Sequence, residues 1–354
     1  MSVYEEDLDV IAKNIREYDF KDNCVMVTGA TGMLGSLLVK GFLRANKIYG
    51  LNNKVYALVR NKEKALDVFK GAFSKDLSFI VNDITGNISP IEGVDYFFHT
   101  ACVTNSKEMS ARPVELIKAS VFGTYNVLDY CVKNNVKKVV YLSSIEAFGV
   151  VNAGRPLSEN DLGFIDITKT RSCYPESKRL NENLVKCFFD EYGLDCVNAR
   201  LAQTFGAGVS LSDNRVFALI AKNVIEGKDI EFKTSGKSAH DYCYTTDCIK
   251  ALLLLAKKGK AGETYNVSNP KTYSSVYEMA KIVVDNFGDK SLKVIRGKEN
   301  DSTQYPCESY VNLDISKISE LGWSPQYDLI EMYDRLISYY KGEEEHVFKE
   351  AKKE

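Results

Sequence analysis

Short apolar runs alternate with longer amphipathic stretches along the first part of the chain, from residue 23 to residue 144. The short runs are rich in β-branched residues and predict strands, whereas the longer stretches repeat their apolar positions at helical spacing. This alternation is typical of βαβ units, which build a parallel sheet covered by helices. The expected strands are 24–29, 54–60, 77–83, 95–101 and 138–144, and the expected helices between them are 33–45, 62–71 and 113–134.

A long amphipathic segment, 174–192, leads to a sixth expected strand at 195–201, and beyond Gly206 the stretches become shorter and more polar. Helical patterns there cover 216–226, 246–257, 275–287 and 329–341. The sequence therefore predicts an α/β fold with a Rossmann-type doubly wound parallel sheet. We expect residues 1–205 to form the dinucleotide-binding domain, and 206–354 to form mainly a smaller substrate-binding lobe with segments that can return to the first domain. The charged last residues, 342–354, predict a solvated or frayed helix.

Composition narrows the class of partner. The 354 residues carry 46 basic and 48 acidic side chains, a net charge of -2, which lacks the basic excess of nucleic-acid or anionic-membrane binding. The N-terminus has no signal-peptide order, and the longest apolar run, 251–256, is far too short to span a bilayer. We expect a cytoplasmic protein without a nucleic-acid or membrane partner.

The nine cysteines are scattered and include no CxxC pair, and no metal site is predicted. Cys24, Cys131, Cys187 and Cys196 stand in apolar surroundings. They are interpreted as buried thiols of a reducing compartment.

A glycine triplet follows the first expected strand, in the run VMVTGATGMLGSLL. Glycines also mark ordinary turns, but a strand before and a helix after them favour a dinucleotide site. Such a turn lets the backbone approach a pyrophosphate, which the amides of the helix N-terminus then bind. The predicted cofactor contacts in this loop are Gly29, Thr31, Gly32, Met33, Leu34 and Gly35.

The ends of the next strands give further candidates for the cofactor. Arg60 stands where an acidic residue would bind the ribose hydroxyls of NAD, and an arginine there can instead accommodate the 2′-phosphate of NADP. It could equally stack on the adenine or lie in solvent. Asp83 is interpreted as an adenine contact or as a turn residue. NAD is the expected cofactor, with NADP open because of Arg60, and the further predicted contacts are Ile84, Thr100 and Ala101.

Tyr174 and Lys178 are four positions apart on an expected helix, so their side chains share one face. An ammonium beside a phenol lowers the pKa of the phenol, which makes Tyr174 a candidate general base and, with Lys178, a cofactor contact. Tyr277 and Lys281 repeat the spacing. Only Tyr174 follows a strand that ends in small hydroxyl residues, Ser143 and Ser144, whereas Tyr277 and Lys281 are interpreted as ordinary helix surface.

Four motifs then occur in order: TGATGMLG, HTA at 99–101, SSIEAFG at 143–149 and YPESK at 174–178. Together they resemble the extended short-chain dehydrogenase/reductase family of nucleotide-sugar epimerases, dehydratases and decarboxylases. Degenerate matches continue to the end of the chain, at 199–206, 214–216, 236–248, 265–270 and the LGWSP run. The resemblance implies that Tyr174 is the catalytic base, that Lys178 holds the nicotinamide ribose and that Ser144 polarises the C4 oxygen. The shared opening step would oxidise the sugar at C4.

Two residues bear on the reaction that follows. Glu146 stands two positions after Ser144, as in decarboxylases of nucleotide-linked glucuronate and in 4,6-dehydratases. The dehydratases pair that glutamate with an aspartate, where this chain has Ile145. Arg215 opens an expected helix, as an arginine does beside the sugar in the decarboxylases, where a guanidinium suits a carboxylate. A contact with solvent or a phosphate is the alternative for Arg215.

Three positions depart from the family pattern. His240 replaces an arginine on the diphosphate, Gln203 replaces an asparagine before a phosphate-contacting turn, and Ser120 replaces an asparagine that braces the active-site helix. Gln203 and His240, with Ser144 and Arg215, are the expected substrate contacts.

The leading hypothesis is a decarboxylase that converts UDP-glucuronate to a UDP-pentose, in the nucleotide-sugar metabolism that feeds polysaccharide biosynthesis. The alternatives are a 4,6-dehydratase, a 4-epimerase and a non-catalytic NAD(P)-sensing protein. By the resemblance, helices near 113–134 and 174–192 would form the seam of a homodimer.

Overall fold

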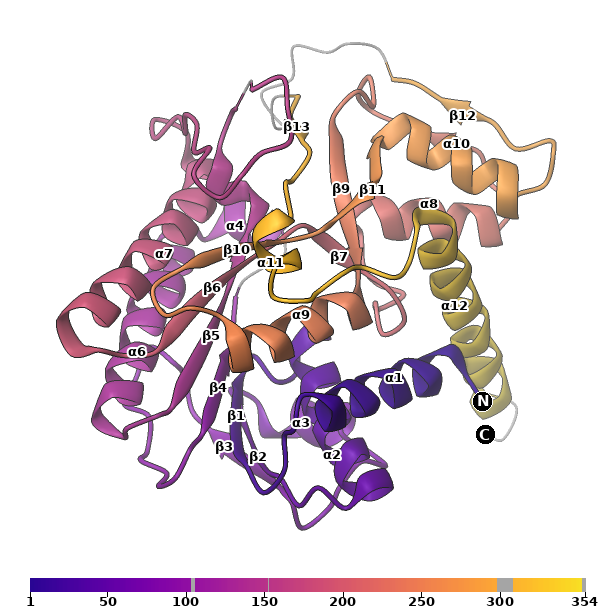
Figure 1. Cartoon of the computed structure of the whole chain (residues 1–354). Helices are drawn as coiled ribbons and strands as arrows, with labels where there is room; N and C mark the ends of the chain where they lie inside the picture. The colour runs from indigo at the N-terminus through magenta and orange to yellow at the C-terminus, as the bar shows by residue number, and fades with distance from the viewer. Residues whose placement is uncertain (103–105, 152, 298–307, 352–354) are drawn as a thin grey trace.

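The computed structural model describes residues 1–102, 106–151, 153–297 and 308–351. A seven-stranded parallel sheet forms the main lobe, and a smaller lobe with its own short sheet lies beside it (Figure 1). The strand order β10-β6-β5-β4-β1-β2-β3 is that of a doubly wound Rossmann sheet with one further edge strand, so the predicted fold class is confirmed. The strands are β1 (Cys24–Thr28), β2 (Lys54–Val59), β3 (Leu77–Val81), β4 (Tyr96–His99), β5 (Lys138–Ser144), β6 (Cys196–Leu201) and β10 (Thr264–Val267).

Helices cover both faces of this sheet, which is why its central strands are apolar along nearly their whole length. On one face lie α2 (Met33–Tyr49) and α9 (Thr245–Lys258), and on the other lie α6 (Gly123–Lys133) and α7 (Cys173–Tyr192). The short α3 (Lys62–Val68) precedes β3. The chain reverses direction across the sheet between β1 and β4, and this switch point is where open α/β sheets bind ligands.

The expected helix 113–134 is divided into three parts. α5 (Pro113–Ile117) leads into a π-helical turn, η1 (Lys118–Phe122), before α6 begins at Gly123. A β-carbon on Gly123 would lie 2.6 Å from the Ile84 side chain, so the absence of a side chain allows the helix to approach the loop after β3. A further short helix, α4 (Ser106–Ala111), comes before α5.

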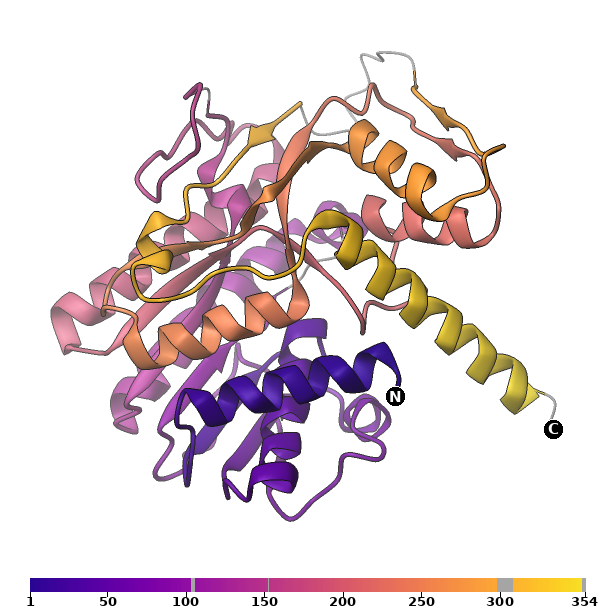
Figure 2. The same ribbon diagram turned by 45° about the vertical axis from the view of Figure 1, so that its right-hand side comes forward.

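The smaller lobe has a four-stranded sheet packed against three helices (Figure 2). Its core includes the stacked rings of Phe205 and Phe217, whose centroids are 4.6 Å apart. β10 and α9 come from the same half of the chain but belong to the main lobe. The elements of this half are β7 (Gln203–Phe205), α8 (Val216–Ile225), β8 (Ile230–Glu231), β9 (Ala239–Tyr244), β11 (Asn269–Ser275), α10 (Val276–Phe287), β12 (Val294–Ile295), β13 (Tyr310–Val311), α11 (Ser316–Ser319) and α12 (Leu329–Ala351).

An N-terminal helix, α1 (Val3–Glu17), was not predicted and packs outside α2 and α9. Its Asp7 is fully buried and joins three distant segments. Asp7 accepts a hydrogen bond from the Tyr244 hydroxyl at the end of β9, at 2.6 Å, and one from Arg335 of α12, at 2.7 Å. Arg335 also donates to the Tyr244 oxygen. This Asp7–Tyr244–Arg335 cluster ties α1 to the smaller lobe.

The cysteine prediction is only partly correct. Cys131 and Cys196 are buried and Cys24 is partly buried, but Cys187 is exposed on α7. The apolar residues around Cys187 belong to a helix whose apolar stripe faces the sheet, and Cys187 lies off that stripe. Within the described ranges, every helix is too short or too polar to be a membrane span.

Candidate active site

The glycine loop has the backbone geometry that close approach to a ligand requires. Gly29 follows β1 with φ +62°, and a β-carbon there would lie 2.7 Å from the backbone of Ala101, beyond β4. A β-carbon on Gly35 would lie 2.4 Å from the Gly29 carbonyl oxygen. Only a glycine at this position therefore lets the start of α2 lie so close to the loop. The Gly32 N–H donates to that same carbonyl at 2.8 Å, and Gly32 is the N-cap of α2. The residues present therefore fit a pyrophosphate placed at the helix N-terminus.

Hydrogen bonds fix the two strand ends that frame this loop. The Thr100 hydroxyl donates to the Thr28 carbonyl at 2.6 Å, and the Ala101 N–H donates to the Thr28 hydroxyl. The buried His99 ring lies between the hydroxyls of Thr28 and Thr124. Burial lowers the pKa of His99 to about 3, so His99 is a neutral brace.

Arg60 and Asp83 both lie exposed, beyond the ends of the neighbouring strands β2 and β3. Partial burial raises the pKa of Asp83, but hydrogen bonds from Thr85 and the charges of Arg60 and Lys118 lower it by more, so the net shift is downward. Asp83 is thus ionised at neutral pH and compensates part of the Arg60 charge. Ile84 is buried, and its carbonyl accepts from Asn126 of α6.

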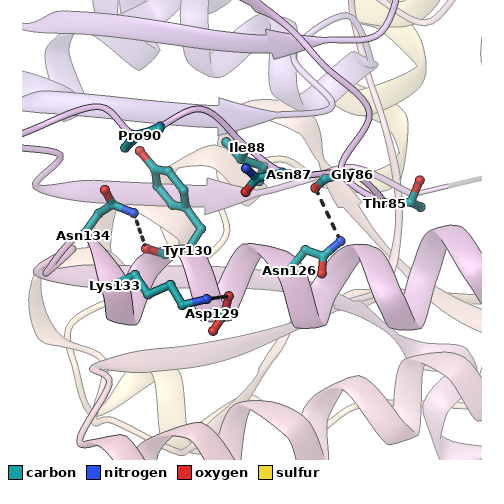
Figure 3. Close-up of a pocket in the computed structure, with 10 residues that line it drawn as sticks. All are labelled: Thr85, Gly86, Asn87, Ile88, Pro90, Asn126, Asp129, Tyr130, Lys133 and Asn134. Carbon is teal, nitrogen blue, oxygen red and sulfur yellow. Dashed lines mark hydrogen bonds and ion pairs between the residues drawn. The ribbon is translucent and has the colours of Figure 1, made fainter.

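A surface cavity of about 520 Å³ begins directly after these residues (Figure 3). It is lined by Thr85 and Gly86 on one side and by α6 on the other, with Asn126, Tyr130 and Asn134 among its polar lining. It does not include Tyr174, Lys178 or Ser144.

The structure brings Ser144, Tyr174 and Lys178 together at the carboxyl end of β5. Ser144 lies close enough to the Tyr174 phenol to lower its pKa, and the Lys178 ammonium lies 5.9 Å from the centroid of the Tyr174 ring. Lys178 donates to the Leu142 carbonyl of β5 at 2.6 Å, which holds α7 against the strand. Tyr277 and Lys281 lie instead on α10 of the smaller lobe, where Arg296 covers the Tyr277 ring.

Burial dominates the protonation of Tyr174 but not that of Lys178. Burial raises the pKa of Tyr174 above its ordinary value, and the Cys102 thiol raises it further, whereas Lys178 and Ser144 lower it. Burial acts against the charged form of Lys178, but Cys102, Tyr141 and Tyr174 raise its pKa above the ordinary value overall. Lys178 therefore stays charged and lowers the pKa of Tyr174 as its spacing predicts, but burial outweighs that effect in the protein alone.

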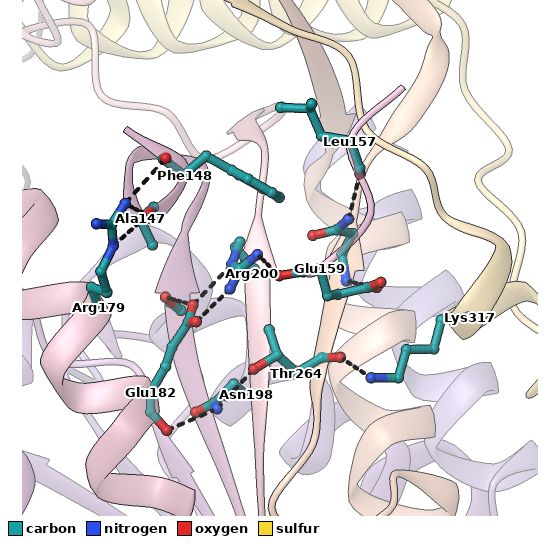
Figure 4. A network of polar contacts seen from close by, with 12 residues as sticks. Ala147, Phe148, Leu157, Glu159, Arg179, Glu182, Asn198, Arg200, Thr264 and Lys317 are labelled. Carbon is teal, nitrogen blue, oxygen red and sulfur yellow. Dashed lines mark hydrogen bonds and ion pairs between the residues drawn. The ribbon is translucent and has the colours of Figure 1, made fainter. Parts of the chain in front are cut away.

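Two supports beneath the site were not predicted. Ser143, buried beside Ser144 on β5, donates to Glu182 of α7, and Glu182 forms a buried two-pronged ion pair with Arg200 of β6. Arg200 also donates to the Glu159 carbonyl, which anchors the loop that precedes α7 (Figure 4). An inward-facing arginine in the expected strand 195–201 was the only sequence signal for this network.

Asn181 of α7 provides the second support. It donates to the Ser120 hydroxyl and carbonyl of η1, both at 3.1 Å, and to Tyr141 of β5. The amide that braces the active-site helix is therefore that of Asn181, on α7. It bonds to Ser120, the position where the family pattern has an asparagine.

Glu146 is the second residue of a short 3₁₀ turn, η2 (Ile145–Phe148), directly after β5. Its backbone N–H donates to the Ser144 hydroxyl at 3.2 Å, and its carboxylate accepts from Arg171 at 2.9 Å. Arg171 belongs to a second 3₁₀ turn, η3 (Thr170–Ser172), immediately before α7, and was not predicted. Its guanidinium carbon lies 5.5 Å from the centroid of the Tyr174 ring.

The other expected substrate residues lie in the smaller lobe. Arg215 is the N-cap of α8, and its side-chain hydrogen bonds within the described residues go to the carboxylate of Asp213. His240 of β9 bonds to the Ser309 hydroxyl at 2.8 Å, and burial lowers its pKa to about 4. His240 is therefore uncharged at neutral pH, unlike the arginine that it replaces. Gln203 is exposed at the start of β7, opposite Tyr242.

Comparison with known proteins places this geometry in a family. The model of the NAD dependent epimerase/dehydratase family matches residues 25–268, from β1 through β10. The chain belongs to the NAD-dependent epimerase/dehydratase family. The matched residues include the glycine loop, Ser144, Tyr174 and Lys178.

Relatives within the family carry the names of three different reactions. UDP-glucuronic acid decarboxylase 6 of Arabidopsis thaliana is 27% identical over 311 residues, which covers 87% of this chain and 85% of that protein. A UDP-N-acetylglucosamine 4-epimerase from Methanobrevibacter ruminantium, solved with UDP-N-acetylmuramic acid, superposes with a TM-score of 0.78 at 22% identity, covering 91% of this chain and 99% of that one. A dTDP-glucose 4,6-dehydratase from Bacillus anthracis, solved with NAD, superposes with a TM-score of 0.74 at 18% identity. The match covers 91% of this chain and 98% of that one. At these identities the two solved structures show the shared fold.

Proposed function

We propose that this family member binds NAD, oxidises C4 of a nucleotide-linked sugar, and converts UDP-glucuronate to a UDP-pentose and carbon dioxide. The observation that carries the proposal is the arrangement of Ser144, Tyr174 and Lys178 beside the glycine loop, with Glu146 at the same strand end. The 27% identical decarboxylase supports the choice of reaction. The intact tyrosine, lysine and serine argue against a non-catalytic NAD(P)-sensing protein.

Each residue of the site has a distinct task in this scheme. Tyr174 accepts the proton of the C4 hydroxyl, Ser144 donates a hydrogen bond to the same oxygen, and Lys178 holds the nicotinamide ribose and keeps a positive charge beside the phenol. NAD held by the glycine loop and Lys178 would supply the hydride acceptor for C4 and would return the hydride within the same turnover. Lys178 lowers the pKa of Tyr174, and the positive charge of a bound oxidised nicotinamide would act in the same direction.

Decarboxylation then needs little additional chemistry. A C4 ketone makes the C5 carboxylate a β-keto acid, so the bond between C5 and the carboxylate carbon can break while its electron pair passes into the C4 enolate. Protonation at C5 completes the step. A 4,6-dehydratase must also protonate a leaving hydroxyl at C6, and the residue before Glu146 is Ile145, which has no proton to give. A 4-epimerase is the remaining alternative, since it needs only the C4 chemistry.

NAD is favoured over NADP because the ionised Asp83 lies near Arg60 and would repel a 2′-phosphate. Titration of the purified protein with both cofactors would compare the two affinities directly.

The test of the reaction is a panel of nucleotide sugars with products identified by mass. We expect UDP-glucuronate to lose the mass of carbon dioxide without stoichiometric consumption of added NAD. Loss of water from a neutral hexose nucleotide, with UDP-glucuronate untouched, would establish the dehydratase instead. Consumption of one cofactor per product would indicate a simple dehydrogenase.

A further inference from the structure

Arg171 has a donor that has no partner among the residues that the structure describes. One guanidinium nitrogen, Nη2, donates to Glu146 at 2.9 Å, whereas Nη1 is buried and has no hydrogen-bond partner. Leaving a buried charged donor unpaired is unfavourable, and guanidinium donors are paired in most folded proteins. A bound acceptor at this nitrogen would remove that cost.

The position of Arg171 limits what that acceptor is. Arg171 lies three residues before Tyr174, on the turn that opens α7, and its guanidinium faces the Tyr174 ring. Glu146, which it pairs with, bonds through its backbone to Ser144. Arg171 therefore lies beside the groups that act on C4, where the substituent on the adjacent C5 carbon would be.

The charges at this point favour an anionic substituent. Glu146 alone would repel a carboxylate on C5, and its ion pair with Arg171 neutralises that charge. The unpaired Nη1 then provides a charge-assisted hydrogen bond to a carboxylate oxygen, the acceptor that a guanidinium binds most strongly. Arg215 is less suited to this task, because Asp213 already occupies its Nε and Nη2 groups.

We propose that Arg171 is the specificity-determining residue for an acidic sugar, with Nη2 held by Glu146 and Nη1 donating to the carboxylate on C5. This assignment rests on the proposed function in one respect: it requires that the sugar's C4 hydroxyl faces Tyr174.

The test compares the binding of UDP-glucuronate with that of UDP-glucose, its neutral counterpart, to the NAD-loaded protein by calorimetry. We expect Arg171→Gln to weaken UDP-glucuronate binding by about 10- to 100-fold, the loss of one charge-assisted hydrogen bond, with UDP-glucose affinity retained. Arg171→Lys, which keeps the charge but not the fork, should recover only part of the loss. Retained UDP-glucose affinity also shows that each variant is folded.

Arg44→Gln is the matched control, because Arg44 also pairs with a carboxylate, Asp9, but on the outer side of α2. Its discrimination between the two nucleotides should equal that of the wild type. Equal weakening of both ligands by Arg171→Gln, or no change in either, would overturn the assignment.

Binding and turnover separate this inference from the proposed reaction. If Arg171→Gln loses discrimination but the wild type releases no carbon dioxide, the carboxylate contact stands and the decarboxylase fails. If the wild type decarboxylates and Arg171→Gln discriminates normally, the reaction stands and the contact is wrong.

Discussion

Burial affects the pKa of Tyr174 more strongly than any single neighbouring charge does. A lysine four positions away predicts a lowered pKa, but the phenol is almost fully buried, and burial raises the pKa of Tyr174. Tyr174 is therefore protonated at neutral pH in the protein alone.

Replacing Tyr174 tests its role as the base. Tyr174→Phe should lower kcat by about 100-fold or more, because general base catalysis typically contributes that much, while NAD binding stays close to normal. Steady-state kinetics and a cofactor titration would measure the two effects. Tyr277→Phe, which repeats the motif on α10, should be nearly silent, and an active Tyr174→Phe enzyme would refute the assignment.

Asp241 of β9 is a second residue that burial perturbs. Its carboxyl accepts from the Leu313 backbone and the Ser268 hydroxyl through Oδ2, while Oδ1 is buried and has no hydrogen-bond partner in the described part of the chain. Burial raises the pKa of Asp241 from 3.8 to about 7. The folded protein therefore holds a proton on Asp241 across a pH range in which the unfolded chain has lost it.

The sign of the pH effect follows from that difference. Between pH 3.8 and about 7 the native state binds more protons than the unfolded state, so this group makes stability fall as pH rises. The asparagine in Asp241→Asn cannot ionise, so the variant should lose this dependence of stability on pH. At pH 8 it should be more stable than the wild type by about 1.4 kcal/mol for each unit by which the pKa of Asp241 differs between the folded and unfolded states. Urea unfolding of both proteins from pH 4 to pH 8 would measure it. Parallel curves for the two proteins would show that Asp241 is ionised in the fold.

At the scale of elements, strong periodicity made the sheet predictable. All six expected strands are present, and the helices after them begin within one residue of their expected positions at Met33, Lys62 and Pro113. The π-helical turn after Ile117 was not predictable, because the approach of Gly123 to Ile84 depends on packing between segments far apart in the chain. Helix α1 repeats the helical spacing at Leu8, Ile11 and Ile15, but it lies outside the alternation that predicts the sheet.

The candidate site also has a part that the sequence predicts and a part that it does not. Tyr174 and Lys178 are four positions apart on one helix and Ser144 ends a strand, so local patterns predict their places, and the structure brings them together. Arg171 was missed because its partner Glu146 is 25 residues away, across a loop whose path no local pattern specifies. The expectation that Arg215 lies beside the sugar stays a prediction, and in the protein alone the Asp213 carboxylate accepts hydrogen bonds from its Nε and Nη2 groups.

The attachment of α1 can be tested through the Asp7–Tyr244–Arg335 cluster. Arg335→Met leaves the fully buried Asp7 without its cationic partner, and we expect the free energy of unfolding to fall by about 3 kcal/mol or more. Arg16→Met is the control on the exposed side of α1, and it should change stability by about 0.5 kcal/mol or less. Chemical denaturation measures both, and adding Asp7→Asn to Arg335→Met should restore part of the loss.

At the scale of the whole molecule, one face of the main lobe is unusually apolar. The helices α5, η1, α6 and α7 pack side by side over the sheet, at the left of Figure 1. The side chains on their outer surface include Phe122, which is 61% exposed. The further exposed apolar side chains of this face are Val114, Ile117, Tyr125, Leu180 and Tyr192. Several exposed large apolar side chains on one group of helices suggest a surface for a partner, because large apolar patches on soluble proteins often mark interaction sites.

A second copy of the chain is the partner that we expect on this face. Two pairs of helices that meet about a twofold axis would bury the same apolar residues from each copy, as a closed dimer requires. Sedimentation should therefore give twice the chain mass of 39.7 kDa for the wild type. The double variant Phe122→Glu/Leu180→Glu places four carboxylates at such an interface and should sediment as a monomer. Ile48→Glu, an equally simple change at an exposed apolar residue of α2, should leave the dimer intact. A monomeric wild type, or dissociation by the Ile48 variant alone, would show that this face has another purpose.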